Sequence, residues 1–204
     1  MRLAPLMILV FVTPVLVACS GSKIIKPEDQ AAIASVSVAA EVKVLKEPVA
    51  IGSGLGLAIL FGAVGAAVDA SASKTGVENF PEFLRTSEID IREIVRERFT
   101  EQLIKNPIYG PKLIADGGPQ FVLEIPLYGI NKTNTFSSVW VPHLSIRYKL
   151  ISPDGKVLAE DNAATRPFSK RPEFTIKDLQ ANPQLLKQAF ENVASSVSAQ
   201  FFEK

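Results

Sequence analysis

Few side chains in this 204-residue chain combine a reactive type with a spacing that would let them do chemistry. His143 is the only histidine and Cys19 the only cysteine, so neither belongs to an HxxxH, HExxH or CxxC motif. Asp154, Glu160 and Asp161 supply the carboxylates of an acid–base pair, but two of them lie beside a turn sequence, where solvation is the simpler expectation. No serine stands in a GxSxG motif. We therefore expect a structural histidine, no metal site and no enzymatic activity.

Two other groups of residues have types that bind ligands without reacting with them. The glycine-rich stretch 52–56 follows a predicted strand, as a phosphate-binding loop does, yet it lacks both the GxGxxG spacing and the GK[ST] ending. Tyr128, Phe136 and Trp140 surround the FSSVW loop, where aromatic rings would suit a partner or a glycan, although core packing and edge coverage explain them more simply. We expect neither a nucleotide nor any other cofactor.

Cys19 stands at the end of an apolar leader. Arg2 is followed by the uncharged run LAPLMILVFVTPVLVA, which predicts a secretory signal over residues 1–18 rather than a membrane span. The sequence LVAC at 16–19 resembles the lipobox of bacterial lipoproteins, which implies cleavage before Cys19 and acylation of that residue by palmitate-type chains. Ser20 resembles the outer-membrane sorting signal of such proteins. The alternative is an ordinary secretory leader with an incidental cysteine.

The resemblance implies a lipid anchor at Cys19 in the outer membrane, facing the periplasm, and two or more acyl chains would hold it stably. Residues 19–33 are polar and small, which predicts a lipidated tether. Residues 34–204 are then one periplasmic domain of ordinary size. Cleavage removes Arg2 from 22 basic residues and leaves 21 against 21 acidic ones, which argues against nucleic-acid binding.

Hydrophobic periodicity predicts the elements of the domain. Residues 36–44 alternate apolar and polar positions, as a strand does. The stretch 87–105 changes to helical spacing, with Ser87 and Asp90 resembling a capping box and Asn106-Pro107 ending the helix. Its apolar stripe consists of Ile91, Ile94, Val95, Phe99 and Leu103.

Three strands and a second helix complete the pattern. Residues 121–125 lead to Pro126, which favours an edge strand or a bulge. Residues 144–150 and 156–160 flank the turn sequence SPDG and predict a hairpin. Thr175 with Asp178 predicts a cap, and the last helix begins near Asn182-Pro183. Its stripe consists of Leu186, Phe190, Val193, Val197 and Phe201. We expect an α+β fold, with a mixed sheet of about four strands and two packed helices.

This order of elements resembles a loose group of envelope lipoproteins. The resemblance lies in FVLEIPLYGI, HLSIRYKLISPDGKVLAED and ANPQLLKQAFENVASSVSAQ, and it covers residues 34–204. The group has domains similar to the amino-terminal domain of TolB and includes the curli-secretion lipoprotein and the lipoprotein of the Pel polysaccharide exporter. The resemblance implies an assembly, export or accessory role rather than catalysis.

An apolar insertion over residues 49–70 follows the first predicted strand. Twenty residues, 49–68, carry no charge, which is long enough for a helix to cross a bilayer core. Three interpretations stay open: a membrane-inserted or membrane-lying segment, a segment buried in a homo-oligomer or partner, and a loop packed on its own domain. Small residues that would allow close helix packing recur at every fourth position, at Gly54, Ala58, Gly62, Ala66 and Ala70.

The sequence thus predicts an outer-membrane-anchored periplasmic lipoprotein, a non-catalytic accessory or scaffold in envelope assembly or export. Its expected partners are the membrane, through Cys19, and an envelope protein. The alternative is an oligomeric export component that inserts in or perforates the membrane with residues 49–70. An enzyme is the third hypothesis, which no motif supports.

Overall fold

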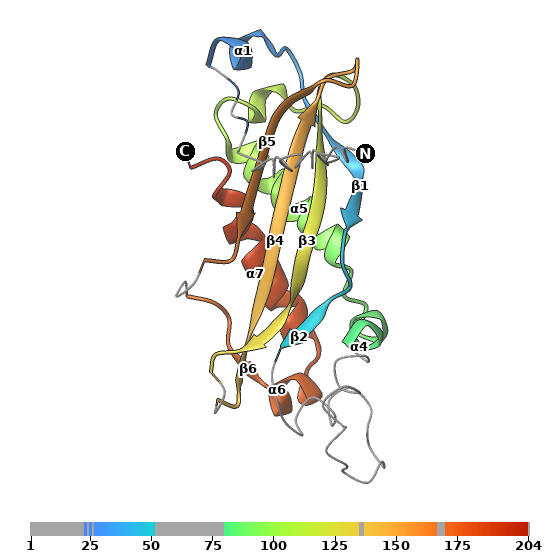
Figure 1. Ribbon diagram of the computed structural model, residues 1–204, viewed down its shortest axis with the longest axis vertical. Helices are drawn as coiled ribbons and strands as arrows, with labels where there is room; N and C mark the ends of the chain where they lie inside the picture. Colours follow the sequence, from blue (N-terminus) through green and yellow to red (C-terminus); the bar gives the residue numbers. More distant parts are fainter. Residues whose placement is uncertain are drawn as a thin grey trace, which may run out of the picture.

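A six-stranded sheet with two long helices on one face forms the framework of the domain (Figure 1). The computed structural model describes residues 23, 25, 27–51, 80–134, 137–166 and 170–203. The strands are β1 (Ser37–Val44), β2 (Val49–Ile51), β3 (Gln120–Lys132), β4 (Val139–Ile151), β5 (Val157–Ala164) and β6 (Phe174–Thr175). The helices are α1 (Pro27–Ala32), α4 (Phe80–Thr86), α5 (Ile91–Lys105), α6 (Ile176–Ala181) and α7 (Gln184–Ala199), with a 3-10 helix η1 (Gly110–Lys112).

The predicted α+β class and mixed sheet are confirmed. The main path of the sheet runs β1-β3-β4-β5, with β1 parallel to β3 and the other neighbours antiparallel. The short helix α6 begins at the predicted Thr175–Asp178 cap. The structure adds elements that the sequence pattern did not predict, namely β2, β6, α1 and α4. Each has seven residues or fewer, which is too short for a clear hydrophobic period.

Strand β3 is central in the sheet and continues through Pro126. The pairing register with β4 shifts between Glu124 and Leu127, so the proline lies in a bulge. The bulge alternative is therefore confirmed. The edge-strand alternative is wrong, because β1 and β4 flank β3 on its two sides.

Helices α5 and α7 cover one face of the sheet, here called the covered face, and lie behind it in Figure 1. All residues of the two predicted stripes are buried. The capping box at Ser87 and Asp90 is wrong: Asp90 itself caps α5, because its side chain accepts a hydrogen bond from the Arg92 N–H at 2.8 Å. Ser87 instead follows α4, with its N–H donating to the Phe83 carbonyl.

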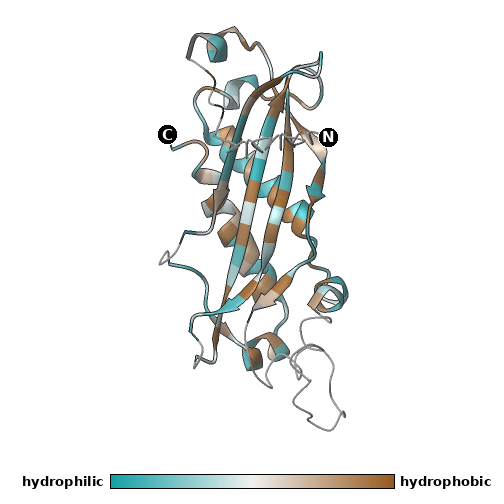
Figure 2. Ribbon diagram, in the orientation of Figure 1, coloured by the Kyte–Doolittle hydropathy of each residue, from teal (hydrophilic) through white to brown (hydrophobic). Residues whose placement is uncertain are grey.

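Aromatic rings fill the space between α5 and the sheet. Phe99 lies 5.5 Å from Phe121 and 6.1 Å from Tyr148, measured between ring centroids. Trp140 and Tyr128 are also buried, so for these two the expected core packing is confirmed, while Phe136 lies outside the described residues. Hydrophobic and hydrophilic bands alternate along β3 and β4, as strands with one covered face require (Figure 2).

One end of the sheet, here called the α1 pole, consists of Lys23, Ile25, residues 27–35 and the β4–β5 turn, 152–156. The turn forms as SPDG predicts: the Gly155 N–H donates to the Ser152 carbonyl at 2.8 Å, and Gly155 has φ +84°. The sequence predicted a tether over 19–33, but its described part packs on the domain, because Ile25 and Ile33 join the core.

The opposite end of the sheet, here called the β2 pole, holds β2, β6, α4 and α6 (Figure 1). Val49 pairs with Gly129 so closely that a Cβ on Gly129 would lie 1.8 Å from the Val49 carbonyl oxygen. Only glycine allows this approach. Because residues 49–51 form β2, one continuous helix over the uncharged run 49–68 is wrong, and 17 uncharged residues, 52–68, follow the strand.

Candidate partner-binding site

Strand β1 forms one edge of the sheet. The Ser37 N–H donates to the Pro119 carbonyl and the Leu45 N–H donates to the Ile125 carbonyl, so these groups point toward the β3 side. Alternate residues of a strand point their polar groups to the other side. There, Val36 exchanges backbone hydrogen bonds with Lys112 and Ile114. No other strand of the described residues pairs with this outer edge.

A groove of about 770 Å³ lies beside this edge, between α5 and the segment 113–115. Val38 and Leu113 supply apolar wall atoms. Ile104 and Ile114 line the groove as well, and these residues are 58% and 42% exposed. Large apolar side chains gathered beside an unpaired strand edge are typical of a surface that another chain covers.

Charged residues of α5 form the rim of the groove. Arg96, Glu97 and Glu101 line it, and Glu101 accepts a 2.8 Å hydrogen bond from Arg98. Arg98 also lies 3.5 Å from Glu191 of α7, and the bond to Glu101 is the main cause that raises the pKa of the Arg98 guanidinium. The Arg98–Glu191 ion pair connects α5 to α7.

The face of the sheet opposite the helices, here called the open face, carries a ladder of charges. Glu124 lies 3.6 Å from Arg147 and 3.5 Å from Lys149, and Arg147 lies 4.0 Å from Glu160. Both signs alternate across β3, β4 and β5, so the ladder neutralises itself. An internally paired surface of this kind lacks the unbalanced charge that would select a charged ligand.

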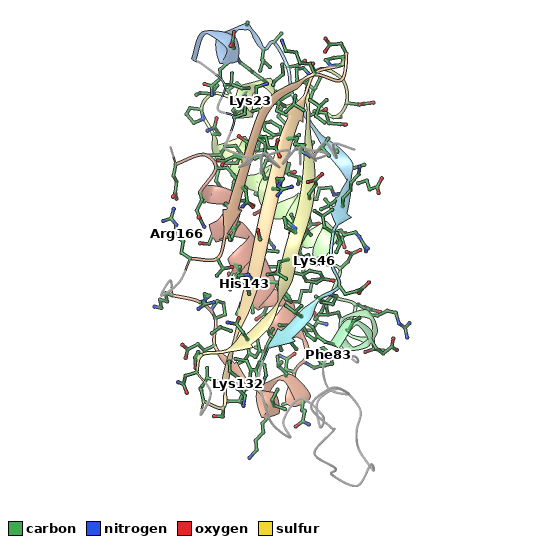
Figure 3. The ribbon with its side chains drawn as sticks, viewed as in Figure 1. Lys23, Lys46, Phe83, Lys132, His143 and Arg166 are labelled. Atoms are coloured by element: carbon green, nitrogen blue, oxygen red, sulfur yellow. The ribbon has the colours of Figure 1, made fainter. Side chains whose placement is uncertain are left out.

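The residues with reactive side chains do not converge. His143 lies on β4 (Figure 3), and burial, followed by the charge of Arg171, lowers the pKa of its ring below the usual value. Glu160 and Asp161 are neighbours on one strand, so their side chains point to opposite faces and cannot act as a pair.

The three carboxylates differ in environment. Asp154 is exposed in the turn, where the Ser152 hydroxyl donates to its carboxylate and lowers its pKa. Asp161 is buried on the covered face, and its Oδ1 accepts from the Asn162 N–H at 2.9 Å. In the described part of the chain, no three potential ligand side chains come close enough to hold a metal ion.

Several predicted positions lie outside the described residues. These are the leader, the lipidation and sorting residues and the small-residue stripe, namely 1–18, Cys19, Ser20, Gly54, Ala58, Gly62, Ala66 and Ala70. Within the residues that are described, every helix is too short or too polar to cross a membrane.

The sequence prediction missed the groove. Ile104 follows the last stripe residue, Leu103, and therefore lies off the buried face of α5, which was the one available signal. The contribution of Ile114 depends on its backbone contact with Val36, far away in the sequence.

Comparisons with known proteins identify no family. No family model matches the chain. No curated protein matches it. Among solved structures, the chain is similar to the crystal structure of protein XCC0632 from Xanthomonas campestris, described under the family model DUF330. The TM-score is 0.41 with 12% identity, over 82% of this chain and 80% of that chain. A likeness at this level supports no conclusion about function.

Proposed function

We propose that this protein is an outer-membrane-anchored periplasmic lipoprotein that serves as a non-catalytic accessory or scaffold in envelope assembly or export. The observation that carries the binding role is the groove beside β1, where Ile104 and Ile114 are exposed next to an unpaired strand edge. The anchor rests on the lipobox-like sequence at 16–19. Together they describe a domain held at a membrane that presents one side to another protein.

The groove favours an extended segment of an envelope protein as its occupant. Val36 forms a short parallel bridge with Leu113 on the outer edge of β1. An extended segment of the partner would pair with the same edge beyond Val36. Every second side chain of the segment would then face the groove, so apolar residues at alternate positions would contact Ile104 and Ile114.

Photo-crosslinking in cells tests the binding role. A photoreactive amino acid at position 104 should give one adduct of defined mass, and Ile114→Asp in the same chain should abolish it. Position 108 is the matched control, because Ile108 is also 42% exposed but does not line the groove. Equal adducts from positions 104 and 108, or an adduct that survives Ile114→Asp, would contradict the assignment.

Metabolic labelling with a palmitate analogue tests the anchor separately. The wild-type protein should be labelled and should fractionate with the outer membrane. Cys19→Ala should lose the label and retain the leader. Labelling of the Cys19→Ala protein would exclude acylation at this residue.

The oligomeric export alternative depends on residues 52–68, which at 17 residues match the lower limit of about 17 for a helix that spans a bilayer. Gly62→Leu keeps the segment apolar but blocks close packing of small residues. If the copies assemble through this segment, the mass in mild detergent should fall from an oligomer to a monomer. An unchanged mass would leave the accessory role as the better explanation.

A further inference from the structure

The first described residue of the chain is fastened to the α1 pole. Lys23 forms an antiparallel bridge with Glu160 of β5: its N–H donates to the Glu160 carbonyl at 2.8 Å, and its carbonyl accepts from the Glu160 N–H at 3.0 Å. Ile25, two residues later, is only 7% exposed. The chain is therefore bound to the domain at Lys23 and Ile25, so a free spacer can lie only before Lys23.

This attachment leaves a very short connection to Cys19. Only positions 20–22 separate Cys19 from Lys23 in the sequence. Four steps of an extended chain span at most about 14 Å. If Cys19 carries the lipid anchor, as proposed above, Lys23 must lie within that distance of the membrane surface.

The two poles lie far apart. Strand β4 has 13 residues and runs almost the whole length between them. At about 3.3 Å per residue, it separates the poles by roughly 40 Å. Figure 3 shows Lys23 near the α1 pole and Lys132 near the β2 pole. A connection of about 14 Å can therefore place only the α1 pole directly beneath the anchor.

The surface of the α1 pole fits a lipid surface. A cavity of about 510 Å³ opens there, with apolar side chains of Ile25, Ile33 and Leu158 in its wall and Lys23 and Lys156 among its polar lining. Alanines at 31, 32 and 34 are exposed beside it. Lysine ammonium groups pair with lipid phosphates, while small apolar surface enters the boundary between headgroups and acyl chains.

The charges of this pole are mixed. Lys23 and Lys156 are accompanied by the exposed carboxylates of Asp29 and Asp154. A bilayer contact here would therefore depend on the anchor and on apolar contact rather than on net charge, and it would not require anionic lipid.

We propose that the α1 pole rests on the membrane that holds the lipid of Cys19, and that the β2 pole points away from it. This inference rests on the proposed anchor. The groove beside β1 then faces sideways, parallel to the membrane, where a neighbouring envelope protein would approach it. Ile51 and Phe80, the described residues that precede and follow the stretch 52–79, lie at the β2 pole, remote from the anchoring membrane.

Fluorescence quenching by lipid measures this orientation. Because Cys19 is the only cysteine and acylation blocks its thiol, an introduced cysteine can be labelled uniquely. Ala31→Cys and Asp154→Cys mark the α1 pole, and Thr133→Cys is the matched control at the β2 pole; all three positions are exposed. The labelled lipoproteins are reconstituted in phosphatidylcholine vesicles that contain a lipid with a nitroxide headgroup.

Labels at 31 and 154 should be quenched at least about threefold more than the label at 133, because the poles lie roughly 40 Å apart. The difference should persist at high salt. Equal quenching at all positions, or stronger quenching at 133, would overturn the orientation. Mass spectrometry of the same samples reports acylation of Cys19: an unmodified Cys19 overturns the proposed anchor and this inference with it, whereas an acylated protein with equal quenching overturns the orientation alone.

Discussion

The two faces of the sheet differ in their charged residues: the covered face is mostly apolar, and the open face carries a ladder of ion pairs. On the covered face, Phe121 pairs across the strands with Leu150, and Asp161 is the one charged residue that is buried within the described part of the chain. On the open face, Glu124 pairs with Arg147 three positions further along the strands, and both side chains lie among other charged groups. The covered face therefore supplies the stability of the domain, while the open face keeps a broad sheet surface compatible with water.

The largest expected effect comes from breaking the covered face at Phe99. This ring is fully buried and contacts rings from both the sheet and the C-terminal segment, including Phe121 and Phe201. Phe99→Ala leaves a cavity and should lower the free energy of unfolding by about 3–5 kcal/mol. Phe99→Leu is the size control and should lose less than about half of that. Urea unfolding measures both; a small loss in Phe99→Ala would show that the cluster does not hold α5 to the sheet.

The three tyrosines sharpen the comparison through pH: Tyr109 and Tyr128 are buried, Tyr148 is partly buried against the core, and all three have raised pKa values. Burial is the main cause for Tyr109, Tyr128 and Tyr148, and for Tyr128 it contributes most to a pKa of about 12. The folded state then holds the Tyr128 proton after the unfolded chain has lost it. Stability is unaffected below pH 10 and falls as the pH rises from about 10 to about 12.

Tyr128→Phe should reduce this alkaline loss by about 2–3 kcal/mol over that window, since one pKa unit corresponds to about 1.4 kcal/mol. Absorbance at 295 nm gives an independent readout: the folded wild-type protein should show little phenolate near pH 10, where each of the three tyrosines of the unfolded protein is about half ionised. Phenolate formation near pH 10 in the folded protein would mean that the tyrosines are not buried.

The sequence predicted those features of the covered face that depend on local spacing. The stripes of α5 and α7, the SPDG turn and the Thr175–Asp178 capping box form as expected, because each depends on residues within a few positions of one another. Features that depend on distant pairing were not predicted. The bridge between Lys23 and Glu160 is one case, and β2 is another.

The candidate site was hidden for the same reason. Ile104 is visible in the sequence only as an apolar residue off the stripe, and its meaning depends on β1 being an edge strand. The edge position follows from the strand order, in which β1 neighbours β3 across more than 70 residues of intervening chain. Local spacing carries no information about that order.

The open face should respond weakly to mutation. Glu124 forms ion pairs with Arg147 and Lys149, and its side chain is 13% exposed. Glu124→Gln keeps the shape and removes the charge, so the free energy of unfolding should fall by about 1 kcal/mol or less, and less at high salt. Urea unfolding at low and high salt measures the effect. If the free energy of unfolding fell by about 3 kcal/mol at both low and high salt, the ladder would behave as a buried ion-pair network. The two faces would then not differ as described.

The smallest effect on stability is expected for a carboxylate–arginine ion pair that lies on a helix away from the sheet. In α4, Glu82 and Arg85 form an ion pair one turn apart, with both side chains more than half exposed. The hydrogen bond from Arg85 lowers the pKa of Glu82, so any stability from the pair would be present above pH 4.5 and lost as the pH falls through the lowered pKa. Water and salt screen a pair this exposed, and Glu82→Gln should leave the thermal midpoint at neutral pH unchanged. Thermal melting of Glu82→Gln and Glu124→Gln, followed by circular dichroism, then gives the difference in stability between an ion pair on the sheet and an exposed pair on a helix. A fall in the thermal midpoint equal to that of Glu124→Gln would show that an ion pair on the open face stabilises the protein no more than a solvent-exposed pair does.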